Sequence, residues 1–147
     1  MNLYTIGFTK KTAEAFFSLI QYSGVDMLID IRLNNNSQLA GFSKGNDLEY
    51  FLSAICGCKY TYDELFAPTK DLMDGMKQKS ISFDEFQAAF RKILDSRKAA
   101  EHFVNEYQSI GSVCLLCSEE VPDKCHRRIV AEYLADKLQG ISIIHLV

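Results

Sequence analysis

The sequence contains no long hydrophobic segment, and no apolar run approaches the roughly 20 residues that a membrane-spanning helix requires. At the N-terminus, no basic region precedes a long apolar core, so no signal peptide is visible. Basic residues are also too few for a broad basic stripe, and the net charge of -3 argues against charge-driven nucleic-acid binding over a large surface. We therefore expect a cytoplasmic protein with no membrane contact and no extensive nucleic-acid surface.

The cysteines do not follow a pattern that is typical of disulfides or of a metal site. Their number, five, is odd, and cytoplasmic chains rarely carry a disulfide framework, so we expect free thiols. Cys114 and Cys117 have C-x-x-C spacing but lie within one predicted strand. Cys117, Cys125 and His126 lack the second spaced pair of a zinc motif. The sequence therefore predicts no metal site, and it names no cofactor.

The chain also has no internal repeat, no low-complexity tract and no linker. Its 147 residues correspond to one domain, residues 1–147. A domain of this length buries about two thirds of the surface that its unfolded chain exposes. We therefore expect a single hydrophobic domain interior rather than two separate units.

Continuous apolar runs alternate with amphipathic segments along the chain. The runs predict buried strands at residues 3–6, 25–31, 112–117 and 141–147, with a short strand at 59–66. Apolar residues at helical spacing predict helices at residues 13–23, 47–55, 83–94, 99–110 and 124–139, three of them capped by Thr12, Ser82 and Asp123. Continuous apolar strands are typical of a parallel sheet that is covered on both faces. We expect a single-domain three-layer α/β/α sandwich with a mainly parallel sheet.

Polar residues follow three of these strands at their carboxyl ends, where α/β sheets bind ligands. They are Gly7 and Thr9 after the first strand, Asp30 and Arg32 after the second, Cys117 and Glu119 after the third, and Cys125, His126 and Arg127 at the start of the following helix. Because these segments meet at one edge of the sheet, we expect the residues to converge on one crevice.

Cys125 is the best candidate for a reactive thiolate. It lies two residues after the predicted cap Asp123, in the first helical turn, where the helix N-terminus and Arg127 lower the pKa of a thiol. The alternative is a buried cysteine that serves as a small hydrophobic side chain. Cys117 either faces the crevice, as another nucleophile or a redox partner, or packs against a helix layer. Cys114 faces the other side of the strand.

The charged residues suit an anionic ligand and acid–base chemistry. Arg127 beside a helix N-terminus is a phosphate or carboxylate site. Arg32 either contacts the ligand or forms a bidentate pair with Asp30, which points the same way and is otherwise a candidate acid or base. Glu119 is a candidate general base or a salt-bridge partner of either arginine. His126 is a candidate acid or base, or a structural side chain.

Residues 34–46 form a polar, glycine-containing loop directly after Arg32, and this loop is longer than the usual connection between a strand and a helix. Long loops beside strand ends often act as lids. Phe42 is the one aromatic residue in the loop. We therefore expect the loop to border the crevice, to be the most mobile part of the chain, and to place Phe42 over a bound ligand.

Four short motifs, taken together and in this order, resemble the DUF488 family. They are Thr5-Ile6-Gly7, Asp30-Ile31-Arg32, Cys117-Ser118-Glu119 and Cys125-His126-Arg127. The resemblance implies a compact α/β fold of about this size and the same site positions, but no particular reaction. Family members commonly have a histidine after T-I-G, where this chain has Phe8. They often have a proline before the serine of the next loop, where this chain reads L-N-N-N-S-Q.

Functions of different classes fit these residues. The first is an enzyme that acts on a small anionic substrate, such as a nucleotide or a modified base, in the crevice. The second is a non-catalytic module that binds a nucleotide or a nucleic-acid end there. A third interpretation is a thiol redox or metal-responsive protein. The sequence specifies neither the reaction nor the oligomeric state.

Overall fold

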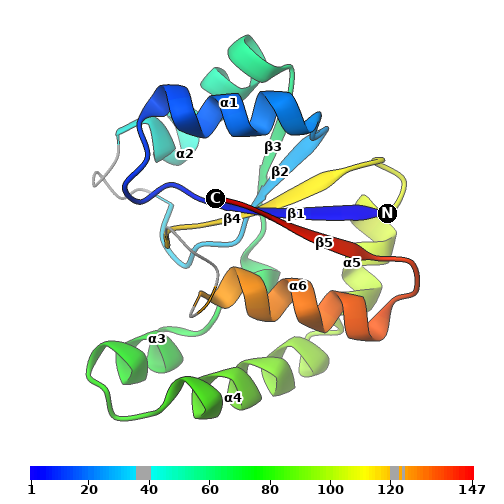
Figure 1. Ribbon diagram of the computed structural model, residues 1–147. Helices are drawn as coiled ribbons and strands as arrows, with labels where there is room; N and C mark the ends of the chain where they lie inside the picture. The colour runs from blue at the N-terminus through cyan, green and yellow to red at the C-terminus, as the bar shows by residue number, and fades with distance from the viewer. Residues whose placement is uncertain (36–40, 120–122, 124) are drawn as a thin grey trace.

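A parallel sheet forms the centre of the computed structural model, which describes residues 1–35, 41–119, 123 and 125–147 (Figure 1). Within these residues the sheet has five strands in the order β3-β2-β4-β1-β5, and all neighbouring pairs are parallel. The strands are β1 (Asn2–Gly7), β2 (Met27–Asp30), β3 (Lys59–Tyr62), β4 (Val113–Cys117) and β5 (Ser142–Leu146). Every residue of β4 is buried, because this continuous apolar strand lies inside the sheet and is covered on both faces.

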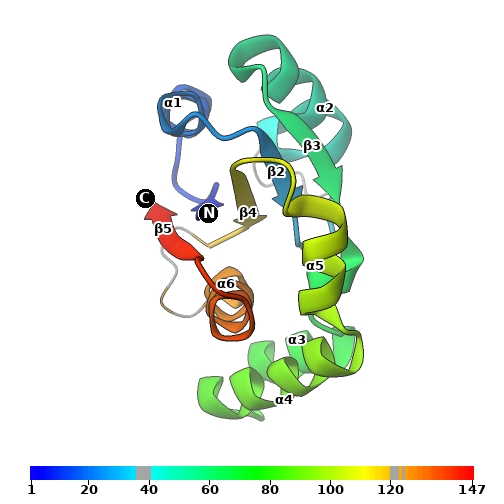
Figure 2. The same cartoon turned by 90° about the vertical axis from the view of Figure 1, so that its right-hand side faces the viewer.

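Helices cover both faces of the sheet, as the side view in Figure 2 shows. On one face lie α1 (Ala13–Ser23) and α2 (Gly45–Phe51), the second of which continues as a π-helical turn over Leu52–Cys56. On the other face lie α5 (Ala99–Tyr107) and α6 (His126–Lys137), with α3 (Lys70–Lys77) and α4 (Phe83–Ser96) outside them. The predicted α/β/α sandwich with a parallel sheet is confirmed.

Alternate residues of a strand point to opposite faces, and this alternation decides which helices each residue meets. In β4, Val113 and Leu115 join the core beneath α4, α5 and α6, whereas Cys114 and Leu116 join the core beneath α1 and α2. Cys117 therefore lies on the α6 side of the sheet. The prediction that Cys114 and Cys117 face opposite sides of the strand is confirmed.

Local sequence signals set the ends of several helices. The hydroxyl of Thr12 accepts a hydrogen bond from the N–H of Ala15 at the start of α1, and Gly24, with a φ of 71°, ends this helix. Ser82 and Glu85 form the predicted capping box at the start of α4. These ends were predictable because each depends on side chains that are near in sequence.

The start of α6 differs from the prediction. The helix begins at His126 with Cys125 as its N-cap, so Asp123 is not the cap and Cys125 does not lie in the first turn. Cys125 keeps an extended backbone, with φ −109° and ψ 143°, and its side chain is 1% exposed. The helix therefore begins without a side-chain cap at Cys125.

Other differences concern the ends of helices and strands and one additional helix. The helix that was predicted at residues 47–55 begins earlier, at Gly45, and becomes π-helical at Leu52. α5 ends at Tyr107, and β3 stops at Tyr62, where a 3-10 turn at Glu64–Phe66 follows. α3 was not predicted at all.

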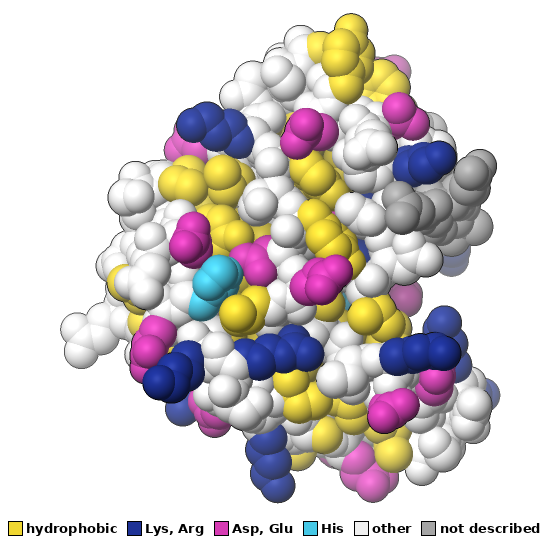
Figure 3. Space-filling model, turned by 180° about the vertical axis from the view of Figure 1, so that it is seen from behind, with side chains coloured by type: hydrophobic (Ala, Val, Ile, Leu, Met, Phe, Trp, Pro, Cys, Tyr) yellow, Lys and Arg dark blue, Asp and Glu magenta, His cyan; other side chains and the backbone are white. Residues whose placement is uncertain are grey.

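Charged side chains of both signs are interspersed on the back of the molecule, around a narrow band of hydrophobic side chains (Figure 3). Among the described residues, none of the helices combines the length and the apolar character that a membrane crossing requires.

Candidate functional site

A cavity of about 810 Å³ lies at the carboxyl ends of β2 and β4, where α/β sheets commonly bind ligands. Its lining residues are Arg32, Leu33 and Asn34 after β2, Lys70, Met73, Asp74, Met76 and Lys77 of α3, Phe86 of α4, and Cys117, Ser118, Glu119, Cys125 and His126 around the start of α6. The cavity therefore brings together five residues that the sequence singled out, namely Arg32, Cys117, Glu119, Cys125 and His126.

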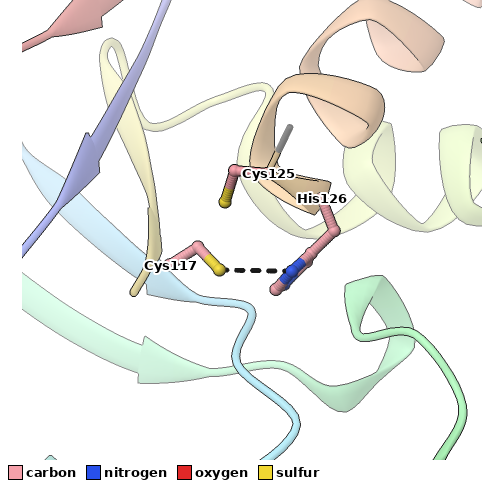
Figure 4. A group of neighbouring side chains, drawn as sticks. All are labelled: Cys117, Cys125 and His126. Atoms are coloured by element: carbon pink, nitrogen blue, oxygen red, sulfur yellow. Dashed lines mark hydrogen bonds between the residues drawn. The ribbon is translucent and has the colours of Figure 1, made fainter. Parts of the chain in front are cut away.

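Cys117 and His126 are in direct contact at the wall of this cavity (Figure 4). The Sγ atom of Cys117 lies 3.2 Å from Nδ1 of His126, and Nε2 of His126 lies 2.8 Å from the backbone oxygen of Ile31. A carbonyl oxygen can only accept a hydrogen bond, so Nε2 carries a proton, and Nδ1 of the neutral ring is an acceptor. In this tautomer Nδ1 is free to accept the thiol proton of Cys117, which is the arrangement of a nucleophile and its base.

Cys125 completes a cluster with this pair. Its sulfur points toward Cys117 in Figure 4, whereas the sulfur of Cys117 points toward the ring of His126, and the two sulfurs and a ring nitrogen of His126 all lie within 4.8 Å of one another. The hydrogen bond from Cys125 to Cys117, followed by burial, raises the pKa of the Cys125 thiol above its ordinary value. The prediction of a lowered pKa is wrong, because these two effects outweigh the nearby cations. Cys117, rather than Cys125, is the better candidate nucleophile.

Asp30 and Arg32 form a buried, bidentate ion pair. Nε and Nη2 of Arg32 donate to the two carboxylate oxygens of Asp30 at 2.9 and 2.7 Å. The hydroxyl of Tyr60 also donates to Asp30, at 2.7 Å, and burial and this bond raise the pKa of Tyr60. Arg32 further donates to the backbone oxygen of Ser43. The carboxylate of Asp30 is therefore engaged within the protein and does not line the cavity, which favours the structural alternative for this residue.

Arg127 lies on the opposite face of the sheet from Arg32. It is completely buried, and it donates through Nη1 to the backbone oxygen of Glu119 and through Nε to the hydroxyl of Thr5, at 3.4 Å. The guanidinium of Arg32 instead packs over the ring of Phe8, 5.3 Å from its centroid, in the core beneath α1. Arg32 lines the large cavity and Arg127 does not, so the two arginines do not converge on one crevice as predicted.

Gly7 and Thr9 connect the ends of β1 and β4 instead of lining the cavity. A Cβ atom at Gly7 would lie 1.6 Å from the backbone oxygen of Glu119, so the two segments pass each other without room for a side chain. The hydroxyl and the N–H of Thr9 both donate to the carbonyl of Ser118, at 2.6 and 3.0 Å. These contacts hold the segment that carries Glu119, whose exposed side chain lies at the cavity.

Phe42 does not lie over the cavity. Its ring packs against Phe16 and Phe17 on the α1 face, with centroids 5.3 and 5.8 Å away, and it lines a separate cavity of about 270 Å³. Its predicted position over a ligand is therefore wrong, because its apolar surface is used in packing against α1. Residues 36–40 of the predicted lid lie outside the described residues.

α3 contributes two cations to the cavity that the sequence analysis missed. Lys70 and Lys77, at the two ends of this helix, line the cavity together with Met73. The available signal was Thr69, whose hydroxyl accepts a hydrogen bond from the N–H of Leu72 and caps the helix. The helix has only eight residues, about two turns, and buries none of them fully, so it offers no long apolar stripe to recognise.

A comparison with protein families agrees with one fold that spans most of the chain. The family profile described as "Domain of unknown function DUF488" matches residues 12–134. The chain belongs to the DUF488 family. No curated protein and no solved structure matches it. In this DUF488 protein the matched range contains every residue that lines the large cavity, whereas β1 and β5 lie outside it.

Proposed function

We propose that this DUF488 protein is an enzyme that acts on a small anionic substrate in the large cavity, with Cys117 as nucleophile and His126 as base. The observation that carries the proposal is the 3.2 Å contact between Sγ of Cys117 and Nδ1 of His126. Its place on the wall of a cavity of about 810 Å³ supports it, because small-molecule sites have volumes of this order.

The proposed reaction is a hydrolysis in two steps. His126 takes the proton of Cys117 on Nδ1, while the Ile31 carbonyl, bonded to Nε2, orients the ring and stabilises the imidazolium. The thiolate attacks an electrophilic carbon of the substrate, the leaving group departs with its bonding electron pair, and His126 returns the proton to it. Water then attacks the sulfur-bound carbon, so the fragment leaves with the hydroxyl group and Cys117 regains a proton.

The lining of the cavity favours a nucleotide or a modified base as the substrate. Lys70 and Lys77 supply cations for a phosphate group, and the N-terminus of α6 adds the positive end of a helix dipole. Met73 and Phe86 offer an apolar wall of the kind against which a base packs. Glu119 is placed to accept hydrogen bonds from a ribose or a base amine.

Labelling with iodoacetamide at pH 7, with the modified thiols mapped by mass spectrometry, tests the nucleophile. We expect Cys117 to react faster than Cys125, whose proton is held by its raised pKa. His126→Asn should slow the labelling of Cys117 by about tenfold or more, because the thiolate is the reacting species. Labelling of Cys117 that is no faster than that of Cys125, in wild type and variant alike, would contradict the proposed role.

The same labelling tests the substrate class. A nucleoside monophosphate at millimolar concentration should protect Cys117, and Lys77→Ala should weaken the protection because a charge-assisted contact to the phosphate is lost. Lys92→Ala is the matched control, since Lys92 is an exposed lysine of α4 outside the cavity. Equal protection in both variants would exclude Lys77 from the binding of the anion.

A non-catalytic module that binds a nucleotide or a nucleic-acid end is the alternative. Phe8 favours it, because this chain has a buried phenylalanine at the position where similar sequences commonly have a histidine. Its ring is 1% exposed and packs beneath Arg32, so it offers no acid or base to the cavity. Nucleotide protection without fast labelling of Cys117 would support this alternative over the enzyme.

A further inference from the structure

We propose that Cys117, Cys125 and His126 form a binding site for a thiophilic divalent cation, best matched by Zn²⁺, with a fourth coordination position open to the large cavity. The proposal goes beyond the enzyme proposed above, because it requires only the cluster and no reaction. The three side chains belong to residues that are 4%, 1% and 6% exposed, and all three line the cavity. Two sulfurs and an imidazole nitrogen are typical ligands of Zn²⁺, whereas Mg²⁺ and Ca²⁺ prefer oxygen ligands.

The distances suit a tetrahedral site. The three donor atoms already lie within 4.8 Å of one another, and Sγ of Cys117 is 3.2 Å from Nδ1 of His126. With Zn–S bonds of about 2.3 Å and Zn–N bonds of about 2.0–2.1 Å, a tetrahedral site separates the sulfurs by about 3.8 Å and each sulfur from the nitrogen by about 3.6 Å. Cys117 and His126 would need to separate by about 0.4 Å, and donor atoms near the 4.8 Å limit would need to approach by about 1 Å, movements that side-chain rotations provide.

The hydrogen bond of His126 to the backbone prepares the ring for a metal. Zinc-bound histidines usually donate their second N–H to a carboxylate or a backbone carbonyl, which sets the tautomer and the direction of the lone pair. In this protein Nε2 of His126 donates to the oxygen of Ile31, at 2.8 Å. The lone pair therefore belongs to Nδ1, the nitrogen that lies beside the sulfur of Cys117.

Charge balance also favours a cation in this place. Two thiolates and one Zn²⁺ form a neutral group, which suits a cluster that is almost completely buried. Without the cation, the negative charges of the two neighbouring thiolates, Cys117 and Cys125, would repel each other. Binding exchanges the two thiol protons for the metal, so two protons are released and the affinity rises with pH.

Three protein ligands leave one position for water or for an anion from the cavity, as in catalytic rather than structural zinc sites. This is why the missing second pair of ligands, which argued against a structural zinc motif in the sequence, does not argue against this site. A bound Zn²⁺ would withhold Cys117 from nucleophilic attack. Zinc occupancy and thiol catalysis would therefore exclude each other, and the metal would inhibit the enzyme proposed above.

Metal titration of the full chain tests the site. We expect calorimetry of chelator-treated protein to give one Zn²⁺ per chain, with release of about two protons at a pH where both thiols are protonated in the free protein. Co²⁺ should produce the visible absorption of a tetrahedral ion and a thiolate-to-cobalt charge-transfer band. Cys125→Ser should lower the Zn²⁺ affinity by more than the 10–100-fold that loss of an outer hydrogen-bond partner causes. Cys56→Ser, which removes a thiol outside the cluster, should leave the affinity unchanged.

Several results would overturn the site: no bound Zn²⁺, a Co²⁺ spectrum without a charge-transfer band, or equal Zn²⁺ affinity in wild type and Cys125→Ser. If Cys125→Ser does not fold, the wild-type Co²⁺ spectrum and His126→Gln decide in its place. The two proposals can fail separately. Fast labelling of Cys117 that Zn²⁺ does not slow would overturn the metal site and keep the enzyme. Stoichiometric Zn²⁺ binding with slow labelling of Cys117 in the metal-free protein would support the metal site and contradict the nucleophile.

Discussion

At the scale of single residues, burial decides what the charged side chains do. Arg32 is 2% exposed and makes a bidentate pair with Asp30, which is fully buried. Arg91 makes an equally short contact to Asp136, 2.6 Å long, but the two side chains are 29% and 64% exposed. Removal of one partner of a buried pair leaves a charge unpaired in the interior, whereas an exposed pair contributes little to stability. Similar ion pairs should therefore respond very differently to mutation.

Arg32→Ala should lower the free energy of unfolding by about 3–5 kcal/mol, because Asp30 would keep a buried, unpaired carboxylate. Urea denaturation followed by circular dichroism measures this change. Arg91→Ala is the matched control and should cost about 0–1 kcal/mol. Equal, small losses in both variants would show that water reaches Asp30, and they would restore Arg32 as a ligand-binding candidate.

At the scale of the elements, the end of β1 holds Ser118 and Glu119, the two residues that follow β4, in place. Thr9 binds the carbonyl of Ser118, Arg127 binds that of Glu119, and Gly7 lets Glu119 pass directly over β1. These two residues directly follow Cys117 at the end of β4. Gly7, Thr9 and Arg127, which were predicted to bind a ligand, thus support the candidate site without lining its cavity.

Gly7→Ala should destabilise the protein by about 1–3 kcal/mol, the cost of an overpacked interior, because the new Cβ would overlap a backbone oxygen rather than a movable side chain. Thermal and urea unfolding measure the loss. Gly41→Ala is the control, since among the described residues no atom beyond its chain neighbours lies within 4 Å of a Cβ there, and its effect should stay within about 0.5 kcal/mol. Similar stabilities of the two variants would show that the segment after β4 moves freely away from β1.

At the scale of the whole molecule, the core beneath α1 and α2 contains thiols that folding keeps protonated. Burial, and then the charge of Cys56, raises the pKa of Cys58 from 9.0 to about 12, and burial also raises the pKa of Cys114. Below about pH 9 both states of the protein carry the Cys58 proton. Between about pH 9 and 12 the unfolded chain has lost this proton and the folded chain has kept it. The stabilisation from this core is therefore complete at neutral pH and is lost as the pH rises.

The free energy of unfolding should fall above pH 9, by about 1.4 kcal/mol per pH unit for each such thiol. Urea titrations at several values between pH 7 and 11 measure this slope. Cys58→Ala should make the slope shallower by about that amount. Leu48→Ala, which truncates an apolar residue of the same core, should lower stability at every pH and leave the slope unchanged. An unchanged slope in Cys58→Ala would mean that this thiol titrates normally in the folded protein.

Features that depend on neighbours in the sequence could be predicted, and features that depend on distant contacts could not. The strand β4 followed from its apolar run, and the ends of α1 and α4 followed from Thr12, Gly24 and the Ser82 capping box. α3 was missed, because its eight residues make only about two helical turns and none of its side chains is fully buried. The start of α6 was misplaced, because the carboxylate signal at Asp123 predicted a cap there, whereas the N-cap is Cys125, which makes no side-chain cap hydrogen bond.

The sequence by itself determined the layered α/β architecture and the presence of Cys117, Cys125 and His126 near the end of one strand, because the apolar periodicity that marks strands and helices is set over short segments. Only the tertiary structure decided which of the candidate residues meet. Strand alternation and helix packing sent Arg32 and Arg127 to opposite faces, and the fold brought α3 to the wall of the cavity. Desolvation and the neighbouring sulfur then reversed the expected shift in the pKa of Cys125, since the free energy of a charge depends on what surrounds it in space rather than along the chain.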